Sequence, residues 1–184
     1  MNTHRITVGG LHRDLPIVPV GPEIEIAFLK LYGDLPLVEA AADELAARLD
    51  PSVEVIVGPE TGGILLSHKL AEKTGRPYVV ARKKIRPNMV APLTVPVQTI
   101  GTAAAQQLVL GDDDAATVGG RAVAIVDEVV SSGGTLVALG ELIRAAGARV
   151  VQTLAVATEG ERRPEVVSLC HLPVFPRVDA VARP

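Results

Sequence analysis

Two adjacent carboxylates stand shortly before a turn of small residues, and this combination is the part of the chain best suited to chemistry. Asp127 and Glu128 end an apolar run, and Ser131-Ser132-Gly133-Gly134-Thr135 follows after two valines. A turn of this composition offers close backbone approach, amide N–H groups and hydroxyl donors, which together hold a phosphate. The two carboxylates are placed to accept hydrogen bonds from sugar hydroxyls. The stretch therefore predicts a sugar-phosphate site.

The elements around this turn are expected to present it at the edge of a sheet. Ala122–Val126 is continuously apolar and rich in β-branched residues, which is typical of a buried parallel strand. A helical pattern follows from Leu136 to Ala146. The turn then lies at a helix N-terminus, where amide N–H groups lack intrahelical partners. The alternative is an ordinary helix start, capped by Ser131 or Ser132, with surface acids beside it.

The rest of the chain alternates strand and helix patterns. Leu37–Leu49 is amphipathic, with Asp34 before it and Pro36 near its first turn. We expect a further helix at Gly62–Lys73 and strands at Val53–Val57, Pro77–Ala81, Gln106–Leu110 and Arg149–Ala157. This order predicts an α/β fold, a parallel twisted sheet flanked by helices. Ligands of such sheets bind beyond the carboxyl ends of the strands, so the loops after Val57, Ala81, Val126 and Ala157 should gather there.

Both ends of the chain carry shorter, extended patterns. Pro16, Pro19 and Pro22 are expected to separate extended pieces at Arg5–Val8, Ile17–Val20 and Glu23–Phe28. We predict one domain over residues 1–184, in which about 1–34 and 159–184 form a small hood and 35–158 the α/β core. The tail from Glu165 is expected to be extended, and Pro87–Ala104 to form an extended or mobile arm. Asp112-Asp113-Asp114 is interpreted as a solvated turn, with a metal site as the alternative.

Composition narrows the classes of function. The chain has 184 residues, 48% of them hydrophobic, and a net charge of −3, which disfavours a general nucleic-acid binder. One cysteine, Cys170, excludes an intramolecular disulfide. No apolar stretch is long enough to span a membrane, and the N-terminal sequence lacks a signal-peptide core. We therefore expect a cytoplasmic protein without membrane contact.

Two other predicted strand ends carry residues suited to anions. Glu60-Thr61-Gly62-Gly63 opens the predicted helix at Gly62–Lys73, with glycines, a hydroxyl and helix-terminal amides. Arg82-Lys83-Lys84 follows the strand at Pro77–Ala81, where cations on an acidic chain suit a pyrophosphate. A helix start that needs glycine for packing and a solvated basic turn are the respective alternatives.

The stretch from Ala122 to Thr135 resembles the phosphoribosyl pyrophosphate (PRPP) signature of type I phosphoribosyltransferases: an apolar strand, two acids, two apolar residues and a Thr/Ser-Gly-Gly-Thr turn. The segment through Gly33-Asp34 and the tail His171–Phe175 resemble the adenine/xanthine branch. This resemblance implies that Asp127 and Glu128 contact the ribose hydroxyls and that Ser131 to Thr135 hold the 5-phosphate. It also implies Asp127 as the group that takes a proton from the base. The second acid is more often Asp in this family.

The same resemblance implies that Glu60, Thr61, Gly62 and Gly63 form the pyrophosphate loop, with Arg82 and Lys83 approaching the pyrophosphate, sometimes across a dimer interface. Adenine-specific relatives commonly have a basic residue where this chain has Gly62, and often an acid in the arm that closes over the site. This chain has no acid between Lys84 and Leu110. Base recognition is expected from the N-terminal segment, around Leu15–Val20, and from loops at the sheet edge.

The implied function is Mg²⁺-dependent transfer of the phosphoribosyl group from PRPP to a purine base, adenine favoured, with release of pyrophosphate, in a homodimer serving purine salvage. Mg²⁺ would be bound through PRPP, with Asp127 or Glu128 contacting it through water. Three alternatives remain open. They are another acceptor (hypoxanthine, guanine, xanthine or a pyrimidine), a PRPP-sensing regulator that binds RNA or DNA, and an unrelated doubly wound nucleotide-binding protein. The chain has no G-x-x-x-x-G-K-[ST] or G-x-G-x-x-G fingerprint, which disfavours the last alternative.

Overall fold

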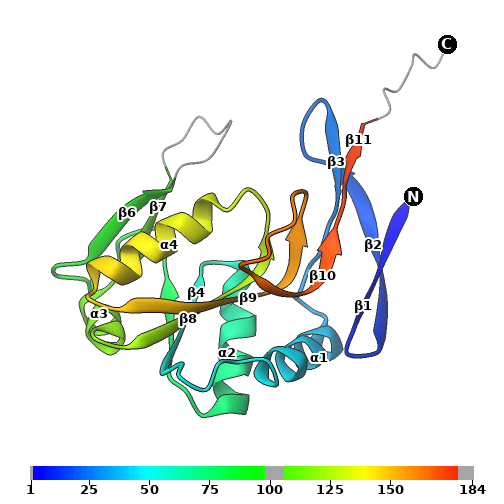
Figure 1. Cartoon of the computed structure of the whole chain (residues 1–184). Coiled ribbons are helices and arrows are strands. Elements are labelled where there is room, and N and C mark those ends of the chain that lie inside the picture. The colour runs from blue at the N-terminus through cyan, green and yellow to red at the C-terminus, as the bar shows by residue number, and fades with distance from the viewer. Residues whose placement is uncertain (1, 98–105, 178–184) are drawn as a thin grey trace.

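A parallel sheet of five strands forms the centre of the molecule (Figure 1). The computed structural model describes residues 2–97 and 106–177. The strand order is β10-β9-β8-β4-β5, and every neighbouring pair is parallel. The strands are β4 (Val55–Pro59), β5 (Tyr78–Ala81), β8 (Ala122–Val130), β9 (Arg149–Glu159) and β10 (Val167–Leu172).

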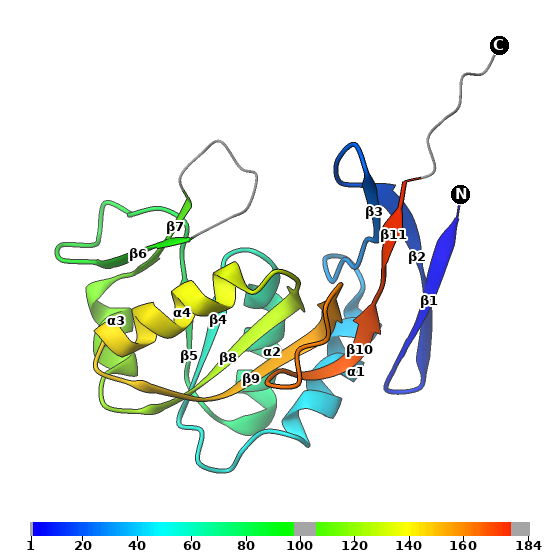
Figure 2. The ribbon, with the colours of Figure 1, turned by 45° about the horizontal axis from the view of Figure 1, so that its top comes forward.

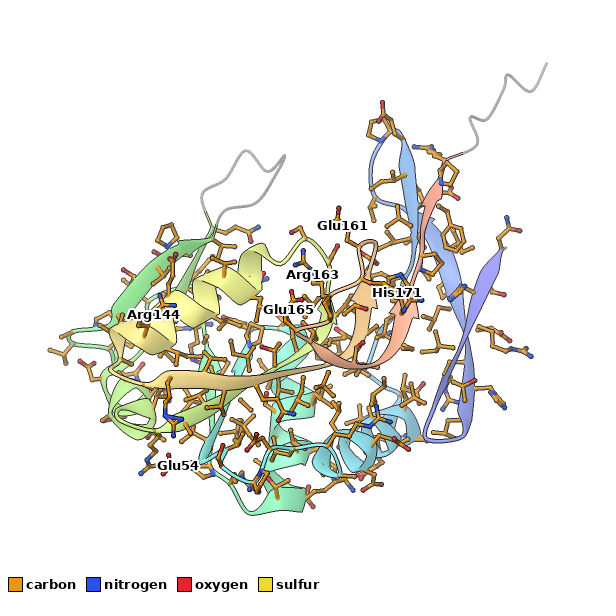
Figure 3. The ribbon with its side chains drawn as sticks, viewed as in Figure 1. Glu54, Arg144, Glu161, Arg163, Glu165 and His171 are labelled. Carbon is orange, nitrogen blue, oxygen red and sulfur yellow. The ribbon has the colours of Figure 1, made fainter. Side chains whose placement is uncertain are left out.

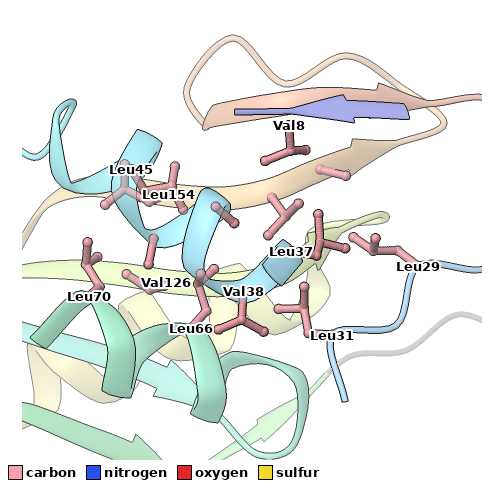
Figure 4. Packing of buried hydrophobic residues seen from close by; sticks show 14 of the residues in the cluster. Val8, Leu29, Leu31, Leu37, Val38, Leu45, Leu66, Leu70, Val126 and Leu154 are labelled. Carbon is pink, nitrogen blue, oxygen red and sulfur yellow. The ribbon is translucent and has the colours of Figure 1, made fainter. Parts of the chain in front are cut away.

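Helices cover both faces of this sheet, because apolar side chains point alternately to its two faces. Ala124 and Val126 of β8 pack with α1 (Leu35–Ala46) and α2 (Gly62–Thr74), and Figure 4 shows this layer from close by. Val123 and Ile125 point to the other face, toward α4 (Gly134–Ala145). That face is completed by α3 (Asp112–Val118) and by the antiparallel hairpin of β6 (Leu93–Val97) and β7 (Gln106–Leu110). Because β8 is apolar on both sides, it can lie at the centre of the sandwich.

The hood is a separate antiparallel sheet beside the core (Figures 1 and 2). It contains β1 (Thr3–Val8), β2 (Leu11–Pro19), β3 (Ile24–Ala27) and β11 (Val174–Pro176). Arg13 of β2 donates two hydrogen bonds to the Asp34 carboxylate, at 2.6 and 2.8 Å, and this pairing lowers the pKa of Asp34. Asp34 also accepts from the backbone N–H of Leu37 and caps α1. One carboxylate thus links the hood to the first core helix.

The predicted fold class is confirmed, and each strand or helix expected between Leu37 and Ala157 is present; the strand at Gln106–Leu110 has the predicted bounds, and the others differ at one or both ends. The expected break at Pro16 is wrong, because β2 runs through it. Pro16 lies where the pairing of β2 changes from β1 to β3, a position at which a missing N–H is tolerated. The tail is extended, but β10 joins the core sheet and only β11 joins the hood, which differs from the expected boundary at residue 159.

The solvated turn expected at Asp112–Asp114 is wrong, because these residues form the first turn of α3. Acids are favourable there, where the helix dipole is positive. The Asp112 carboxylate accepts from the N–H groups of Val90 and Ala91, both at 2.8 Å. Part of the expected arm Pro87–Ala104 is β6, and residues 98–105 lie outside the described part of the chain.

No helix in residues 2–97 and 106–177 is long and apolar enough to cross a membrane.

Candidate functional site

The acid pair stands where β8 continues beyond its neighbour β4. The pairing of β4 with β8 ends at Val57 and Ile125, whereas β9 follows β8 as far as Val130. The predicted strand is therefore longer than expected, and Asp127 and Glu128 are part of it. Successive strand residues point to opposite sides. Asp127 consequently shares the side of α4, and Glu128 shares the side of α2.

The surroundings of Asp127 favour its neutral form. Withdrawal from water raises the pKa of Asp127 to about 7, and the nearby Glu128 charge adds to this rise. A hydrogen bond of 2.7 Å from the N–H of Glu128 and the charge of Lys83 oppose the shift. Burial also raises the pKa of Glu128. A carboxyl with a pKa near neutrality can take up or release a proton at physiological pH.

The turn after β8 encloses a small cavity, called here the phosphate-loop cavity. It has a volume of about 110 Å³ and is lined by Asp127 and by Ser131 to Thr135. Gly133 has a φ of +83° and is the N-cap of α4, and no side chain in the described structure caps this helix. The alternative in which Ser131 or Ser132 caps the helix is therefore not what the structure shows. The first amides of α4 thus have no side-chain acceptor among the described residues, which is the condition under which helix N-termini are suited to anions.

A second cavity, the acid-pair cavity, lies between this turn and the loop after β4. Its volume is about 240 Å³. Its lining combines most of the residues expected to act together, namely Glu60, Thr61, Gly62, Lys83, Asp127, Glu128 and Thr135. Asp127 lines both cavities, so the acid pair joins the two glycine-rich loops into one site.

The two glycines of the loop after β4 serve different purposes. A Cβ at Gly63 would stand 2.6 Å from Cδ of Pro59 and 2.7 Å from the carbonyl oxygen of Val126. Gly63 is thus required for the close packing of α2 on the sheet. A Cβ at Gly62 would stand 2.7 Å from Oε2 of Glu128. The extra methylene of Glu128, compared with Asp, brings its carboxylate against the position where a side chain of residue 62 would begin.

The basic residues after β5 do not all face this site. The backbone of Arg82 pairs with Val109 of β7, and Arg82 lines a separate cavity together with Asp112 to Asp114.

Lys83 lines the acid-pair cavity, and its backbone N–H donates to Oε2 of Glu60 at 2.9 Å. The other Glu60 oxygen lies 3.6 Å from Nη2 of Arg86. Glu60 therefore connects the loop after β4 to the basic segment. The peptide bond between Glu60 and Thr61 is cis.

The linker between hood and core contributes contacts that the sequence did not reveal. The N–H of Leu31 donates to Oε1 of Glu128 at 2.7 Å, and the Tyr32 hydroxyl donates to the carbonyl oxygen of Thr61 at 2.5 Å. Burial and the charges of Glu128, Asp127 and Glu60 raise the pKa of Tyr32, so its hydroxyl keeps its proton. Tyr32 is one of only two tyrosines in the chain. That scarcity is the only sequence signal that could have drawn attention to it.

Arg163 is a second residue that sequence analysis missed. It lies between β9 and β10 and donates to the carbonyl oxygens of Ser131 and Ser132. Within the segment Leu15–Val20, expected to recognise the base, Leu15 is buried in the hydrophobic core.

A parallel sheet with two glycine-rich loops on either side of an acid pair is an arrangement typical of α/β proteins that bind phosphate-containing ligands. The model of the family described as "Phosphoribosyl transferase domain" matches residues 30–171. This match covers more than half of the chain, and the chain belongs to that family.

Curated relatives agree with this assignment. The chain is 34% identical over 125 residues to the hypoxanthine/guanine phosphoribosyltransferase of Methanothermobacter thermautotrophicus, covering 68% of this chain and 61% of that protein. It is 30% identical over 162 residues to the adenine phosphoribosyltransferase of Novosphingobium aromaticivorans, covering 82% and 84%. The match to the hypoxanthine/guanine proteins thus spans less than two thirds of their length.

Solved structures show the same fold. The adenine phosphoribosyltransferase of Rhodothermus marinus superposes with a TM-score of 0.69 at 23% identity, covering 85% of this chain and 93% of that one. That of Thermoanaerobacter pseudethanolicus gives a TM-score of 0.68 at 22% identity, covering 85% and 95%.

Proposed function

We propose that this protein transfers the phosphoribosyl group from PRPP to a purine base, with adenine as the favoured acceptor, and releases pyrophosphate. The observation that carries the proposal is the acid pair at the junction of two glycine-rich loops that share one cavity. PRPP has a sugar with a phosphate at one end and a pyrophosphate at the other, which matches an acid pair between two anion sites. A relative matched over 84% of its length is named for adenine, and others are named for hypoxanthine and guanine, which keeps those bases as alternatives.

The 5-phosphate is assigned to the phosphate-loop cavity. Ser131, Ser132 and Thr135 supply hydroxyls, and Gly133 and Gly134 supply amides at the start of α4. Asp127 and Glu128 would accept hydrogen bonds from the ribose hydroxyls, since both line the acid-pair cavity. Oε1 of Glu128 is already engaged by the N–H of Leu31, so Oε2 is the atom we assign to the sugar.

Pyrophosphate is assigned to the loop after β4 and to Lys83. Thr61 and Gly62 line the acid-pair cavity and would offer backbone amides, and Lys83 would offer a positive charge in the same cavity. Gly63 does not line that cavity, and we assign its amide to the pyrophosphate as part of the same helix start. A carboxylate repels a phosphate, so the part we assign to Glu60 is to hold the Lys83 segment beside the loop. Arg82 faces a separate cavity in this chain, and we assign it to pyrophosphate only across the interface of a proposed homodimer.

The residues present fit a magnesium ion carried by the substrate. Mg²⁺ binds through one or two carboxylates together with substrate phosphates and retained waters, and the acid pair offers those carboxylates. Within residues 2–97 and 106–177 no group of three or more His, Cys, Asp or Glu side chains could hold a metal on its own. When bound, Mg²⁺ would offset negative charge on the departing pyrophosphate.

The remaining chemistry is assigned to Asp127. A ring nitrogen of the base bonds to the anomeric carbon while the bond from that carbon to pyrophosphate breaks. The proton of the attacking nitrogen must then leave, and a carboxylate with a pKa of about 7 is suited to accept it.

The test is pyrophosphate release from PRPP and Mg²⁺ in the presence of each of a panel of purine and pyrimidine bases. Release with adenine supports the proposal, and release with another base alone replaces the acceptor. A PRPP-sensing regulator is the second candidate, since position 62 is a glycine and the Glu128 carboxylate occupies the space where a side chain of residue 62 would begin. Binding of PRPP by calorimetry without release by any base would favour it.

A further inference from the structure

Arg163 donates hydrogen bonds to the carbonyl groups of the loop assigned to the 5-phosphate. It belongs to the connection between β9 and β10, and Figure 3 shows it beside the turn that precedes α4. Its Nε donates to the carbonyl oxygen of Ser131 at 2.8 Å, and its Nη2 donates to that of Ser132 at 2.5 Å. The guanidinium group presents its N–H donors in a fixed plane, so two consecutive carbonyls can be held at once.

Because the peptide bond is planar, the hydrogen bonds that fix these two carbonyl groups also fix the direction of the N–H groups that follow them. In a planar trans peptide the C=O of one residue and the N–H of the next point in opposite directions. Because the carbonyls of Ser131 and Ser132 point to Arg163, the N–H groups of Ser132 and Gly133 point away from it. Arg163 lines a cavity of about 290 Å³ on one side of the loop, together with Glu159. The phosphate-loop cavity is enclosed by the same loop and by Asp127.

Gly133 makes this approach possible. A Cβ on Gly133 would stand 2.9 Å from both Cζ and Nη1 of Arg163. The guanidinium group therefore occupies the space where any side chain at position 133 would lie. The φ of +83° at Gly133 also favours glycine. The glycine thus serves the contact with Arg163, whereas a side chain there would not point into the phosphate-loop cavity.

We propose that Arg163 is a positioning residue that holds the amides of Ser132 and Gly133 toward the 5-phosphate of the substrate. This inference rests on the proposed function only in naming the bound phosphate as the 5-phosphate of PRPP. The orientation of the two amides does not depend on that function. Arg163 acts through the loop and touches no reacting atom. The positive charge of Arg163 lies on the side of the loop opposite the proposed anion, and Glu165 at 3.5 Å partly compensates it. The remaining charge makes the electrostatic potential at the 5-phosphate position more favourable for an anion.

The test separates the two halves of the substrate. Ribose 5-phosphate and pyrophosphate are titrated separately, by calorimetry, into the full chain and into Arg163→Ala, Arg163→Lys and Arg163→Gln. Arg162→Ala is the matched control, because Arg162 is the exposed neighbour of the same type. We expect Arg163→Ala to weaken ribose 5-phosphate binding about 10- to 100-fold, since two charge-assisted hydrogen bonds are lost. Arg163→Lys should recover part of the affinity, and pyrophosphate affinity should change less than about twofold.

Steady-state kinetics with the accepted base give an independent readout. Loss of positioning at the 5-phosphate should raise the KM for PRPP and leave kcat nearly unchanged, because the 5-phosphate is bound equally in ground and transition states. Equal weakening of both ligands, or no weakening in Arg163→Ala, overturns the proposal. Should Arg163→Ala fail to fold, the Lys and Gln variants decide by the same comparison.

These outcomes are distinct from failure of the proposed function. A chain that binds ribose 5-phosphate but releases pyrophosphate from PRPP with no base would disprove the proposed enzyme. The role of Arg163 would still be decided by the ribose 5-phosphate titration.

Discussion

The loop after β8 and the loop after β4 lie on either side of the acid pair, yet they are held in different ways. The first, Ser131 to Thr135, has two carbonyls gripped by the guanidinium of Arg163. The second has one carbonyl, that of Thr61, bound by the neutral hydroxyl of Tyr32. Charge-assisted and paired hydrogen bonds are stronger than a single neutral one, so the carbonyl groups of the first loop are held more firmly than that of Thr61.

Their ionic surroundings differ as well. The loop after β8 contains small and hydroxylated residues and no acid. The loop after β4 contains Glu60, whose carboxylate is occupied by the Lys83 N–H and lies near Arg86. If the proposed function holds, this contrast has a chemical reason. The 5-phosphate stays attached to the sugar throughout the reaction, whereas pyrophosphate has to leave. A rigid site suits the group that anchors the substrate, and a weaker hold suits the group that departs.

Asp127 lies between the two loops, and its substitution should have the largest effect. Asp127→Asn keeps the shape of the side chain but removes the charge and the ability to accept a proton. We expect kcat/KM to fall by roughly 10²- to 10⁴-fold, the range typical of general acid–base groups. The measurement is pyrophosphate release, with Asp113→Asn, an exposed acid of α3, as the control. A rate within a few-fold of the unaltered protein would remove Asp127 from the chemistry.

The same variant tests the raised pKa of Asp127 in the absence of ligand. A folded-state pKa of about 7 means that between about pH 4 and 7 the folded protein binds more protons than the unfolded chain. Stability therefore falls as the pH rises through this window, and the loss is complete above it. Asn carries no such penalty, so Asp127→Asn should be more stable at pH 8 by on the order of 1–3 kcal/mol. Urea unfolding at pH 5 and pH 8 measures this, and an advantage independent of pH would contradict it.

Gly133→Ala should disrupt only the firmly held loop. A side chain at a φ of +83° is strained and would displace the Arg163 guanidinium, which lies 2.9 Å from the added Cβ. We expect about a tenfold loss of ribose 5-phosphate affinity, about 1–2 kcal/mol of lost stability, and unchanged pyrophosphate binding. Gly140→Ala, in the interior of α4 with open space around it, is the control and should stabilise the protein by about 0.5–1 kcal/mol.

Gly62→Ala should have a smaller effect, confined to the other loop. Its Cβ would meet Oε2 of Glu128 at 2.7 Å, and that oxygen belongs to a movable side chain. We expect the KM for PRPP to rise several-fold, with ribose 5-phosphate affinity nearly unchanged, because Glu128 must shift. Combining Gly62→Ala with Glu128→Asp should cost less than the sum of the two single changes. Strict additivity would show that the two positions are independent.

Local patterns in the sequence were sufficient to predict the framework of the site. The apolar run at Ala122–Val126 predicted a central strand, and the glycine pair predicted the start of a helix. Both properties depend on neighbouring residues alone, through strand burial and helix-terminal geometry. The three acids at Asp112–Asp114 were misinterpreted, because acids are equally favourable in a solvated turn and in the first turn of a helix.

The residues that hold the loops could not be predicted in this way. Arg163 binds a loop about thirty positions earlier in the chain, and Tyr32 binds Thr61 across a similar separation. An arginine or tyrosine followed by a turn has no local property that specifies such a partner. Only the folded arrangement brings the hood linker and the β9–β10 connection to the two loops. The sequence therefore predicts which backbone is offered to a ligand, but not which side chains fix its orientation.

Tyr32→Phe should have the smallest effect and gives the most direct comparison with Arg163. It removes one neutral hydrogen bond to the Thr61 carbonyl and keeps the aromatic ring in place. A bond of this kind contributes about 0.5–1.5 kcal/mol, so pyrophosphate binding should weaken two- to tenfold while ribose 5-phosphate binding stays the same. We expect the opposite selectivity for Arg163→Ala, so the two changes combined should be additive in binding of PRPP. Weakened ribose 5-phosphate binding in Tyr32→Phe would mean that the two loops are not held independently, and that the acid pair couples them into one rigid unit.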